Sequence, residues 1–326
     1  MWGVLRKAWS RFAPQVMPAI ASIRLVSNVL GHYSPLLMKT TLTRRAFLNR
    51  TTAACALPLF SLTSLGKAAN LGVLNGLDFP LVDFHVHLDN SSIEKVLPLS
   101  QERGIKFGIV EHAGTKENKY PTVLSNDAEL KAYMQMLAGK PVYKGVQAEW
   151  TDWMGCFSRE VLGQLDFVLT DAMTFPGPNG QRMKLWERGA EIGDPEKFMD
   201  RYADWHVEIM AHEPIDILAN TTWLPQALAA DYDRLWTPAR MKKVIDAAVK
   251  HQAALEISAS YKLPRMPFLK MAKEAGAKFS FGSNGRFPNM GKLDYSIQMA
   301  KELGLKASDM FTPGPEGQKA VQRRKY

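Results

Sequence analysis

The chain has 326 residues, with 41 Lys and Arg against 32 Asp and Glu, and its sequence pI is about 9.4. The basic excess lies in residues 1–68, which contain nine basic and no acidic side chains. Without those nine, residues 69–326 have 32 basic and 32 acidic side chains, so their formal charge is zero. A nucleic-acid-binding function based on net basic charge is therefore excluded for this part of the chain.

The N-terminal segment carries the pattern of an export signal. Thr43-Arg44-Arg45-Ala46-Phe47-Leu48-Asn49 resembles the twin-arginine signal, an apolar stretch follows over 51–65, and Gly66-Lys67-Ala68 is a small-residue cleavage site. The apolar stretch is too short to span a membrane, so no stable membrane anchor is expected. We expect 38–68 to be a signal peptide for the twin-arginine export machinery, which leaves a periplasmic or secreted protein. The alternative is a basic amphipathic helix that stays on the mature chain.

Two further features concern this segment. Met38 is the expected translation start, which makes residues 1–37 a doubtful upstream leader. Of the two cysteines, Cys55 falls in the apolar stretch and Cys156 remains alone. No intrachain disulfide is therefore expected in residues 69–326, even in an oxidising compartment.

Residues 69–326 have the size and the pattern of a single α/β barrel domain. Apolar strands alternate with amphipathic helices, which predicts parallel strands joined by right-handed crossovers. Seven strands are expected, at 81–87, 106–112, 142–149, 166–173, 215–221, 253–259 and 278–283. Helices are expected at 92–103, 128–137, 195–212, 238–251, 264–275 and 293–303. The Gly- and Pro-rich segment after the fourth strand is expected to form a loop over the barrel mouth.

The run Leu81–Asp89 predicts a buried strand that ends in two histidines. Side chains of a strand alternate between its faces, so His85 and His87 are expected to point one way and Phe84 the other. Two imidazoles on one face are the beginning of a metal site, and barrel enzymes hold their chemistry at the carboxyl ends of the strands. The alternative is a chance pair of core or surface histidines.

Three further motifs accompany His85-Val86-His87: Glu111-His112 after an apolar run, Gly145-Val146-Gln147-Ala148-Glu149, and Phe281-Gly282-Ser283-Asn284. In this order, over residues 80–312, they resemble the PHP domain, named for polymerase and histidinol phosphatase. The resemblance implies a distorted seven-stranded parallel (β/α) barrel that is TIM-barrel-like. It also implies up to three divalent metal ions and the cleavage of phosphoesters.

The resemblance implies a set of metal ligands as well. The family holds one ion with two first-strand histidines, a glutamate of the third strand and an aspartate of the last strand. The matching positions here are His85, His87, Glu149 and Asn284, so three ligands are kept and the fourth has lost its charge. We expect one divalent ion, zinc, manganese or iron, bound by the first three.

The ligands for a second and a third ion are mostly missing. The family fills two positions on the fourth and fifth strands with histidines, and these are Met173 and Asn220 here. Of the ligands to the third ion only His112 is kept, and Arg286 stands at the last-strand position. The resemblance therefore implies a reduced site.

Three side chains are candidates for the catalytic chemistry: His112, Asp171 and Arg286. His112 is expected to bind the metal, or to act as an acid near its usual pKa of about 6.5. Asp171 is expected to face inward at the end of the fourth strand as a substitute ligand or general base, and the alternative is a turn or cap acid. Glu149 has an alternative role as a buried carboxylate paired with Lys144 or Arg159.

Positive and aromatic side chains at the strand ends predict an anionic small-molecule substrate. Arg286 can replace part of the charge of a missing metal and bind an anionic oxygen bidentately. The expected substrate contacts follow the last three strands: Trp223, Tyr261, Lys262 and Asn284. The alternatives are a solvated loop charge for Lys262 and a core or lid role for Trp223.

Together these features predict an exported metal-dependent hydrolase, a phosphoesterase rather than an amidohydrolase, that acts through metal-activated water. A bound ion can lower the pKa of such a water to about 7. Two alternatives stay open. One is a catalytically degenerate barrel that binds a ligand without turnover, and the other is a metal-dependent amidohydrolase or lyase on the same architecture.

Overall fold

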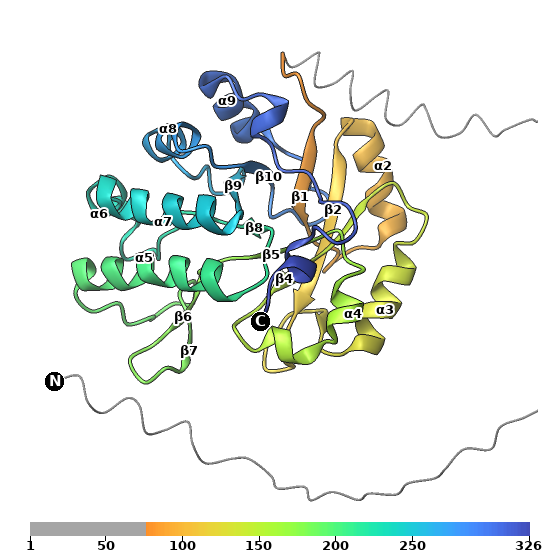
Figure 1. Ribbon diagram of the computed structural model, residues 1–326, viewed down its shortest axis with the longest axis horizontal. Coiled ribbons are helices and arrows are strands. Elements are labelled where there is room, and N and C mark those ends of the chain that lie inside the picture. The colour runs from red at the N-terminus through yellow and green to blue at the C-terminus, as the bar shows by residue number, and fades with distance from the viewer. Residues whose placement is uncertain (1–75) are drawn as a thin grey trace, which may run out of the picture. The chain divides into compact units, whose positions relative to one another are not determined.

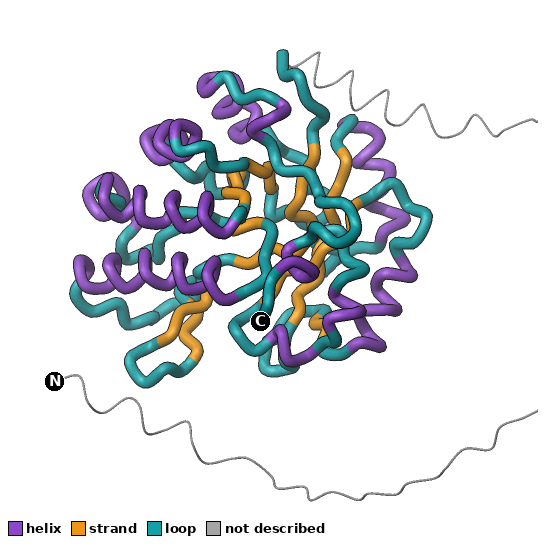
Figure 2. Tube along the Cα trace, in the orientation of Figure 1, coloured by secondary structure: helices purple, strands orange, loops and turns teal. Residues whose placement is uncertain are grey.

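The computed structural model describes residues 76–326, so the expected leader and signal peptide lie outside the described residues. The described residues form an α/β barrel with strands at the centre and helices around them (Figure 1, Figure 2). The predicted fold class, a distorted seven-stranded (β/α) barrel, is confirmed. Within 76–326, no helix combines the length and the apolar character that crossing a membrane requires.

Seven parallel strands follow one another around the barrel in chain order. They are β1 (Val82–Val86), β2 (Lys106–Ala113), β4 (Tyr143–Ala148), β5 (Phe167–Thr170), β8 (Ile217–Leu218), β9 (Ala254–Ser258) and β10 (Phe279–Gly282). Gly285, just after β10, joins the last strand to the first. Its N–H donates to His85 O at 2.9 Å, and its carbonyl accepts from His87 N at 2.9 Å. A further short strand, β3 (Val123–Leu124), pairs with β2.

Helices occupy most of the connections between these strands. They are α2 (Ile93–Arg103), α3 (Asp127–Met136), α4 (Arg159–Leu162), α5 (Pro195–His212), α6 (Tyr232–Leu235), α7 (Pro238–His251), α8 (Met266–Glu274), α9 (Asp294–Leu303) and α10 (Ala320–Arg323). Local residue types fix their ends. Asp194 caps α5 by accepting from Lys197 N at 2.9 Å, and Gly104 ends α2 in the left-handed conformation at φ 62°.

The Gly- and Pro-rich segment after β5 contains a hairpin where a loop was expected. Its strands, β6 (Thr174–Pro176) and β7 (Arg182–Lys184), pair antiparallel. Arg182 joins the hairpin to the loops that follow β2 and β4, because it donates to Asn118 Oδ1 at 2.9 Å and to Asp152 Oδ2 at 2.7 Å. The segment therefore lies at the mouth formed by the carboxyl ends of the strands.

An apolar cluster from facing strands fills the barrel interior. Phe167 of β5 reaches across to Phe84 of β1, with ring centroids 5.2 Å apart. Two glycines make room for the Phe167 ring: a Cβ atom on Gly108 would lie 2.9 Å from it, and one on Gly145 would overlap with it. Phe311, from the C-terminal segment, packs on Phe84 at the amino-terminal end of the barrel, and the two ring centroids lie 5.1 Å apart.

The expectation that Phe84 points away from the histidines is wrong, because β1 is not a regular strand. Its pairing with β2 shifts register between Asp83 and Val86, which indicates a β-bulge. A bulge adds a residue and changes where the following side chains point. Phe84 and His85 therefore both face the interior. His85 and His87 still lie together, with ring centroids 5.2 Å apart.

Candidate functional site

Three side chains at the ends of β1 and β2 form a group that can hold a metal ion. His87, Asp89 and His112 each offer a ligand atom within 4.8 Å of the others. The parallel pairing of β1 with β2 places them side by side, since the first two follow β1 and the third ends β2. The rings of His87 and His112 stack with their centroids 4.7 Å apart. We call these three residues the metal group.

The atoms of the metal group fit a divalent cation. Both ring nitrogens of His87, Oδ1 of Asp89 and Nε2 of His112 are buried and have no hydrogen-bond partner among residues 76–326. Each such atom costs about 1–3 kcal/mol, so several in one place indicate a missing binding partner. Two imidazoles and a carboxylate are a donor set used by catalytic zinc and iron. Burial holds the pKa of His87 well below its usual value, which keeps the ring neutral, as a ligand must be.

His112 is fixed in an orientation typical of metal-binding histidines. Its Nδ1 donates to Glu149 Oε1 at 2.7 Å, which leaves Nε2 facing the metal group. Tyr120 stacks on the ring at 3.6 Å between centroids and donates to Glu149 Oε2 at 3.3 Å. Burial opposes the charged form of His112, but the nearby carboxylates of Asp89 and Glu149 outweigh it and raise the pKa to about 9. A metal ion that binds at Nε2 must therefore displace a proton from the ring.

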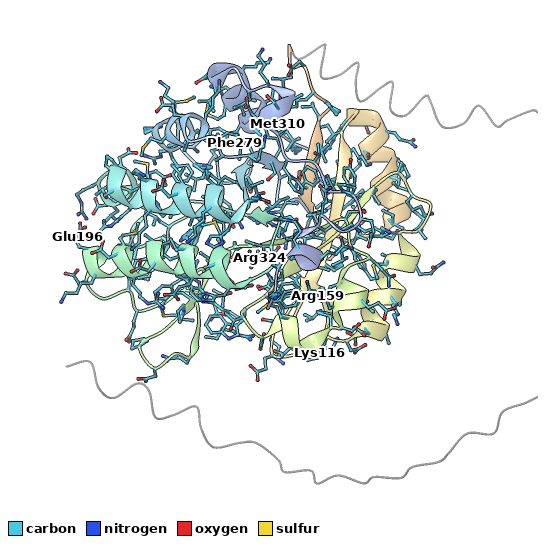
Figure 3. The ribbon with its side chains drawn as sticks, in the orientation of Figure 1. Lys116, Arg159, Glu196, Phe279, Met310 and Arg324 are labelled. Atoms are coloured by element: carbon cyan, nitrogen blue, oxygen red, sulfur yellow. The ribbon has the colours of Figure 1, made fainter. Side chains whose placement is uncertain are left out.

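Glu149 does not take the alternative roles considered from the sequence. In the described part of the chain, its carboxylate contacts His112 and Tyr120 and pairs with neither Lys144 nor Arg159. Arg159 instead joins α4 to the C-terminal segment, by donating to the carbonyls of Gln322 at 2.8 Å and Arg324 at 2.7 Å (Figure 3).

His85 lies beside the metal group, but protein side chains contact both of its ring nitrogens. Nδ1 lies 3.0 Å from Glu256 Oε1, and Nε2 lies 3.0 Å from Gln147 Oε1. Glu256 reaches this position from β9 because Gly282 of the neighbouring β10 has no side chain: a Cβ atom there would overlap with Glu256 Oε1. The second carboxylate oxygen accepts from Asn220 N at 2.6 Å. His85 is therefore held in a buried network across the barrel.

The predicted ligand set is thus divided between two clusters. The structure groups His87 with Asp89 and His112. Of the other two predicted ligands, His85 contacts Glu256, and Glu149 contacts His112. A direct bond from either of them to a metal stays a prediction.

Asp171 faces the barrel mouth from the end of β5. Its Oδ1 accepts from Met173 N and its Oδ2 accepts from Asn220 Nδ2, each at 2.9 Å. Burial, reinforced by the charge of Glu149, raises its pKa to about 6. A carboxyl group with this pKa can deliver a proton near neutral pH. The bond to Met173 N is also what a turn acid makes, so both interpretations of Asp171 agree with the geometry.

Arg286 and Asn284 connect the metal group to an open groove. Arg286 Nε donates to Asp89 Oδ2 at 3.0 Å, and its Nη1 donates to Asn284 Oδ1 at 2.6 Å. The groove has a volume of about 690 Å³, and its lining includes three cations, Lys262, Arg286 and Lys292, against one acid, Asp294. This imbalance favours an anionic ligand next to the metal group.

The aromatic residues predicted to contact substrate lie together at the mouth. Trp223 and Tyr261 meet edge to face with ring centroids 6.3 Å apart. Strained backbone gathers at the same end of the barrel. Five non-glycine residues that follow strand ends have positive φ: Trp150, Asn220, Thr222, Lys262 and Asn284. Such conformations are uncommon, and they concentrate at functional sites.

Four residues of this arrangement were not foreseen as members of the site. Asp89 had a signal, because it continues the alternation of His85 and His87 by one more step. Glu256 also had a signal, as the single charged residue of a buried strand. No signal in the sequence marked Gln147 or Tyr120, because their role depends on which strands and loops meet in space.

Comparison with protein-family models and with curated proteins gives no match. Among solved structures, the chain is similar to histidinol phosphate phosphatase from Lactococcus lactis subsp. lactis Il1403, complexed with zinc, L-histidinol and phosphate. The TM-score is 0.53 and the identity 12%, over 74% of this chain and 98% of that chain. At this identity the similarity shows the fold alone.

Two further structures score lower and support no argument. One is an HpcH/HpaI aldolase/citrate lyase family protein from Burkholderia cenocepacia J2315, with a TM-score of 0.32 and 16% identity over 74% of this chain and 100% of that chain. The other is an HpcH/HpaI aldolase from Desulfitobacterium hafniense DCB-2, with a TM-score of 0.33 and 11% identity over 76% of this chain and 98% of that chain.

Proposed function

We propose that the protein is a metal-dependent hydrolase of the PHP type that cleaves a phosphoester of a small anionic molecule. The observation that carries this proposal is the metal group. Its three residues offer ligand atoms within 4.8 Å of one another, and four of their buried side-chain atoms have no hydrogen-bond partner within residues 76–326. The cationic groove beside it supports an anionic substrate. The fold supports it too, because a phosphatase crystallised with zinc and phosphate shares it.

One divalent ion, zinc, manganese or iron, is the proposed cofactor, held by His87, Asp89 and His112. An ion bound there supplies Lewis-acid stabilisation of negative charge on a transferring phosphoryl group. One ion is proposed because, in the described residues, the ring nitrogens of His85 already contact Glu256 and Gln147.

The protein's own residues would bind and orient the substrate. Arg286 Nη2 makes no hydrogen bond within the described residues, so it is free to bind a phosphoryl oxygen while Nε and Nη1 hold the guanidinium in place. In the hydrolysis, the oxygen of a water forms a bond to phosphorus as the bond from phosphorus to the leaving oxygen breaks. Asp171, which follows β5, delivers its proton to that leaving oxygen. Tyr120 covers one face of His112 and keeps water from it.

A barrel that binds a ligand without turnover is the second candidate. The pairing of His85 with Glu256 favours it, since a histidine tied to a buried carboxylate and an amide is not free to bind metal in this arrangement. Met173 and Asn220, at positions where the resembled family has ligands, favour it as well.

We also propose that the protein is exported by the twin-arginine machinery to the periplasm or beyond. The sequence pattern of residues 43–68 supports export, and a protein that takes up its metal before export fits a route that carries folded cargo.

Elemental analysis of the full chain, purified without added metal, tests the central claim. His87→Ala and His85→Ala form a matched pair: about one equivalent of metal is expected in the wild type and in His85→Ala, and none in His87→Ala. Phosphate release from 4-nitrophenyl phosphate should be lost together with the metal. Loss of metal from both variants would return His85 to the ligand set. If the wild type takes up no metal on titration, the hydrolase proposal fails and the barrel that binds a ligand without turnover remains as the candidate.

A further inference from the structure

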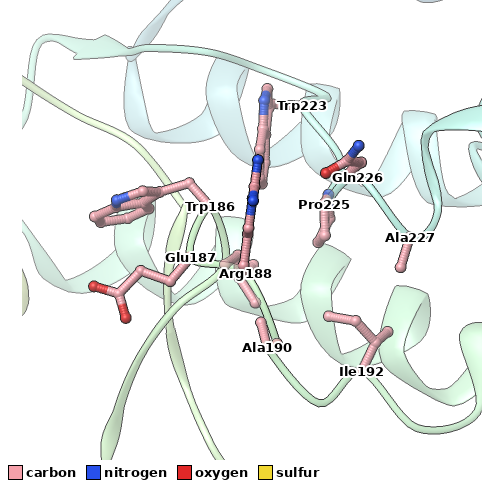
Figure 4. Close-up of a pocket in the computed structure, with 11 residues that line it drawn as sticks. Trp186, Glu187, Arg188, Ala190, Ile192, Trp223, Pro225, Gln226 and Ala227 are labelled. Carbon is pink, nitrogen blue, oxygen red and sulfur yellow. The ribbon is translucent and has the colours of Figure 1, made fainter.

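A cavity separate from the metal group opens between the loop that follows β7 and the segment that follows β8. Its volume is about 350 Å³, and its lining includes Glu187, Arg188, Ile192, Trp223 and Gln226. Figure 4 shows the side chains of Arg188 and Trp223 extending into the space between the two segments. The volume is at the lower end of the range for small-molecule sites, which suits a ligand part of about one ring.

Both walls of the cavity are hydrogen-bonded to the residues that hold Asp171. On one wall, Leu185 N donates to Met173 O at 2.9 Å, and Met173 N donates to Asp171 Oδ1 at 2.9 Å. On the other wall, Trp223 N donates to Asn220 O at 3.0 Å, and Asn220 Nδ2 donates to Asp171 Oδ2 at 2.9 Å. The cavity therefore lies on the Asp171 side of the mouth, whereas the metal group lies on the side of β1 and β2.

This placement matches one half of a substrate. In the proposed reaction, the phosphoryl group lies at the metal group, and the leaving oxygen must reach Asp171. The remainder of the leaving alcohol then continues past Asp171 towards the cavity. The inference in this subsection rests on the proposed phosphoesterase function for that assignment.

The lining indicates the chemistry of the group that would bind. Arg188 is exposed and has no ion pair or hydrogen bond to any residue of the described chain. Glu187, the acid beside it, lies 3.6 Å from Lys184 Nζ, so its charge is already matched. Trp223 is half-buried and its indole is supported by Tyr261. An indole surface binds a ring, and a free guanidinium binds a carboxylate or another anion.

We propose that this cavity binds the leaving-group half of the substrate and selects a ring that carries an anionic substituent. The ring packs on Trp223, and the anion pairs with Arg188. The phosphoester is then recognised at two places, by Arg286 at the phosphoryl group and by Arg188 at the far end of the molecule.

Two phosphoesters that differ by one carboxylate test the selection. The full-length protein, loaded with metal, is given 3-carboxyphenyl phosphate or phenyl phosphate, and kcat/KM is measured for each. The wild type is expected to prefer the carboxylated substrate by on the order of tenfold. Arg188→Ala should reduce this ratio to about one, and Trp223→Ala should weaken the use of both substrates. Lys301→Ala, an exposed cation on α9, is the matched control and should keep the ratio of the wild type.

A binding measurement separates this inference from the proposed function. Titration calorimetry with 3-hydroxybenzoate and with phenol needs no turnover, and the acid is expected to bind about tenfold more tightly than phenol, through Arg188. If no phosphoester is cleaved but this difference is seen and is lost in Arg188→Ala, the phosphoesterase function fails and the ring-and-anion site stands. If phosphoesters are cleaved but Arg188→Ala changes neither the kcat/KM ratio of the two phosphates nor the affinity ratio of 3-hydroxybenzoate to phenol, the cavity proposal is overturned.

Discussion

Asp171 is the residue whose protonation state most directly affects the proposed reaction. Burial and the charge of Glu149 raise its pKa to about 6, so the protonated fraction falls as the pH rises through that value. If it protonates the leaving oxygen, kcat should decrease above about pH 6.

Asp171→Asn cannot donate a proton and should lower kcat by about 100-fold or more for alkyl phosphates. The loss should be smaller for 4-nitrophenyl phosphate, whose leaving group needs little protonation. Steady-state kinetics on both classes check this, and an equal loss for both would contradict it.

Glu213 is a buried acid outside the candidate site, and it makes stability depend on pH. Its Oε2 accepts from Trp153 Nε1 at 2.8 Å. Burial raises its pKa from 4.5 to about 8, although Trp153 and the charge of Arg324 favour the ionised form. Between these pH values the folded protein keeps a proton that the unfolded chain has released. The free energy of unfolding therefore has its full contribution from protonated Glu213 below pH 4.5, and this contribution decreases as the pH rises towards 8.

Glu213→Gln removes this dependence while it keeps an acceptor for Trp153. The free energy of unfolding of the variant should match the wild type near pH 4.5 and exceed it increasingly towards pH 8. Denaturant titrations at several pH values, followed by tryptophan fluorescence, measure the difference. Glu208→Gln, an exposed acid paired with Arg201, is the control and should follow the wild-type slope. Equal pH slopes for Glu213→Gln and the wild type would contradict the assignment.

Individual site residues could be predicted from the sequence where their type and local spacing were sufficient. His87 and His112 end strands in patterns that indicate a metal site, and both lie in the metal group. Glu256 could not be assigned as the partner of His85, because that contact depends on closure of the barrel and on the missing side chain of Gly282. Spacing along one strand carries no information about which side chain lies across the barrel.

Elements were predictable to the extent that one periodicity or cap determined them. All seven barrel strands lie within or close to their expected ranges, and α7 begins and ends as expected at Pro238 and His251. The fifth barrel strand, β8, is shorter than expected, with only Ile217–Leu218 paired. The chain turns just after it, at Asn220 and Thr222, which both have positive φ. The bulge in β1 was not predictable, since it is a property of the pairing with β2.

The contact between β4 and β5 inside the barrel depends on the absence of one side chain. Gly145→Ala places a Cβ atom in the ring of Phe167, which is buried and packed against Phe84. We expect a destabilisation of about 1–3 kcal/mol from overpacking. Gly155→Ala is the control, because a Cβ atom there meets no atom of residues 76–326 within 4 Å. Chemical denaturation of both variants measures the difference, and equal stabilities would show that the interior adapts to the added methyl group.

At the scale of the whole molecule, the ring order explains how distant segments share one site. The strands follow one another in chain order, so each strand end adds its residues at a fixed place around the mouth. The metal group comes from β1 and β2, Asp171 follows β5, and the Arg286 groove follows β10. The substrate is therefore expected to lie across the mouth, from the metal group to the cavity beside Asp171.

The charge distribution of the whole chain leads to a prediction about export. The formal charge of +9 comes entirely from residues 1–68, so a purely electrostatic role of this segment would survive any exchange of Arg for Lys. A twin-arginine signal depends on the arginines themselves. In a bacterial host, Arg44→Lys/Arg45→Lys should leave a precursor in the cytoplasm, while the wild type yields an exported form that begins at Ala69. Cell fractionation and intact-mass measurement check this, with Arg50→Lys, in the same segment, as the control that keeps the charge and the arginine pair. Equal export of the double variant and the control would contradict the signal, and an exported form that keeps residues 51–65 would favour a helix retained on the mature chain.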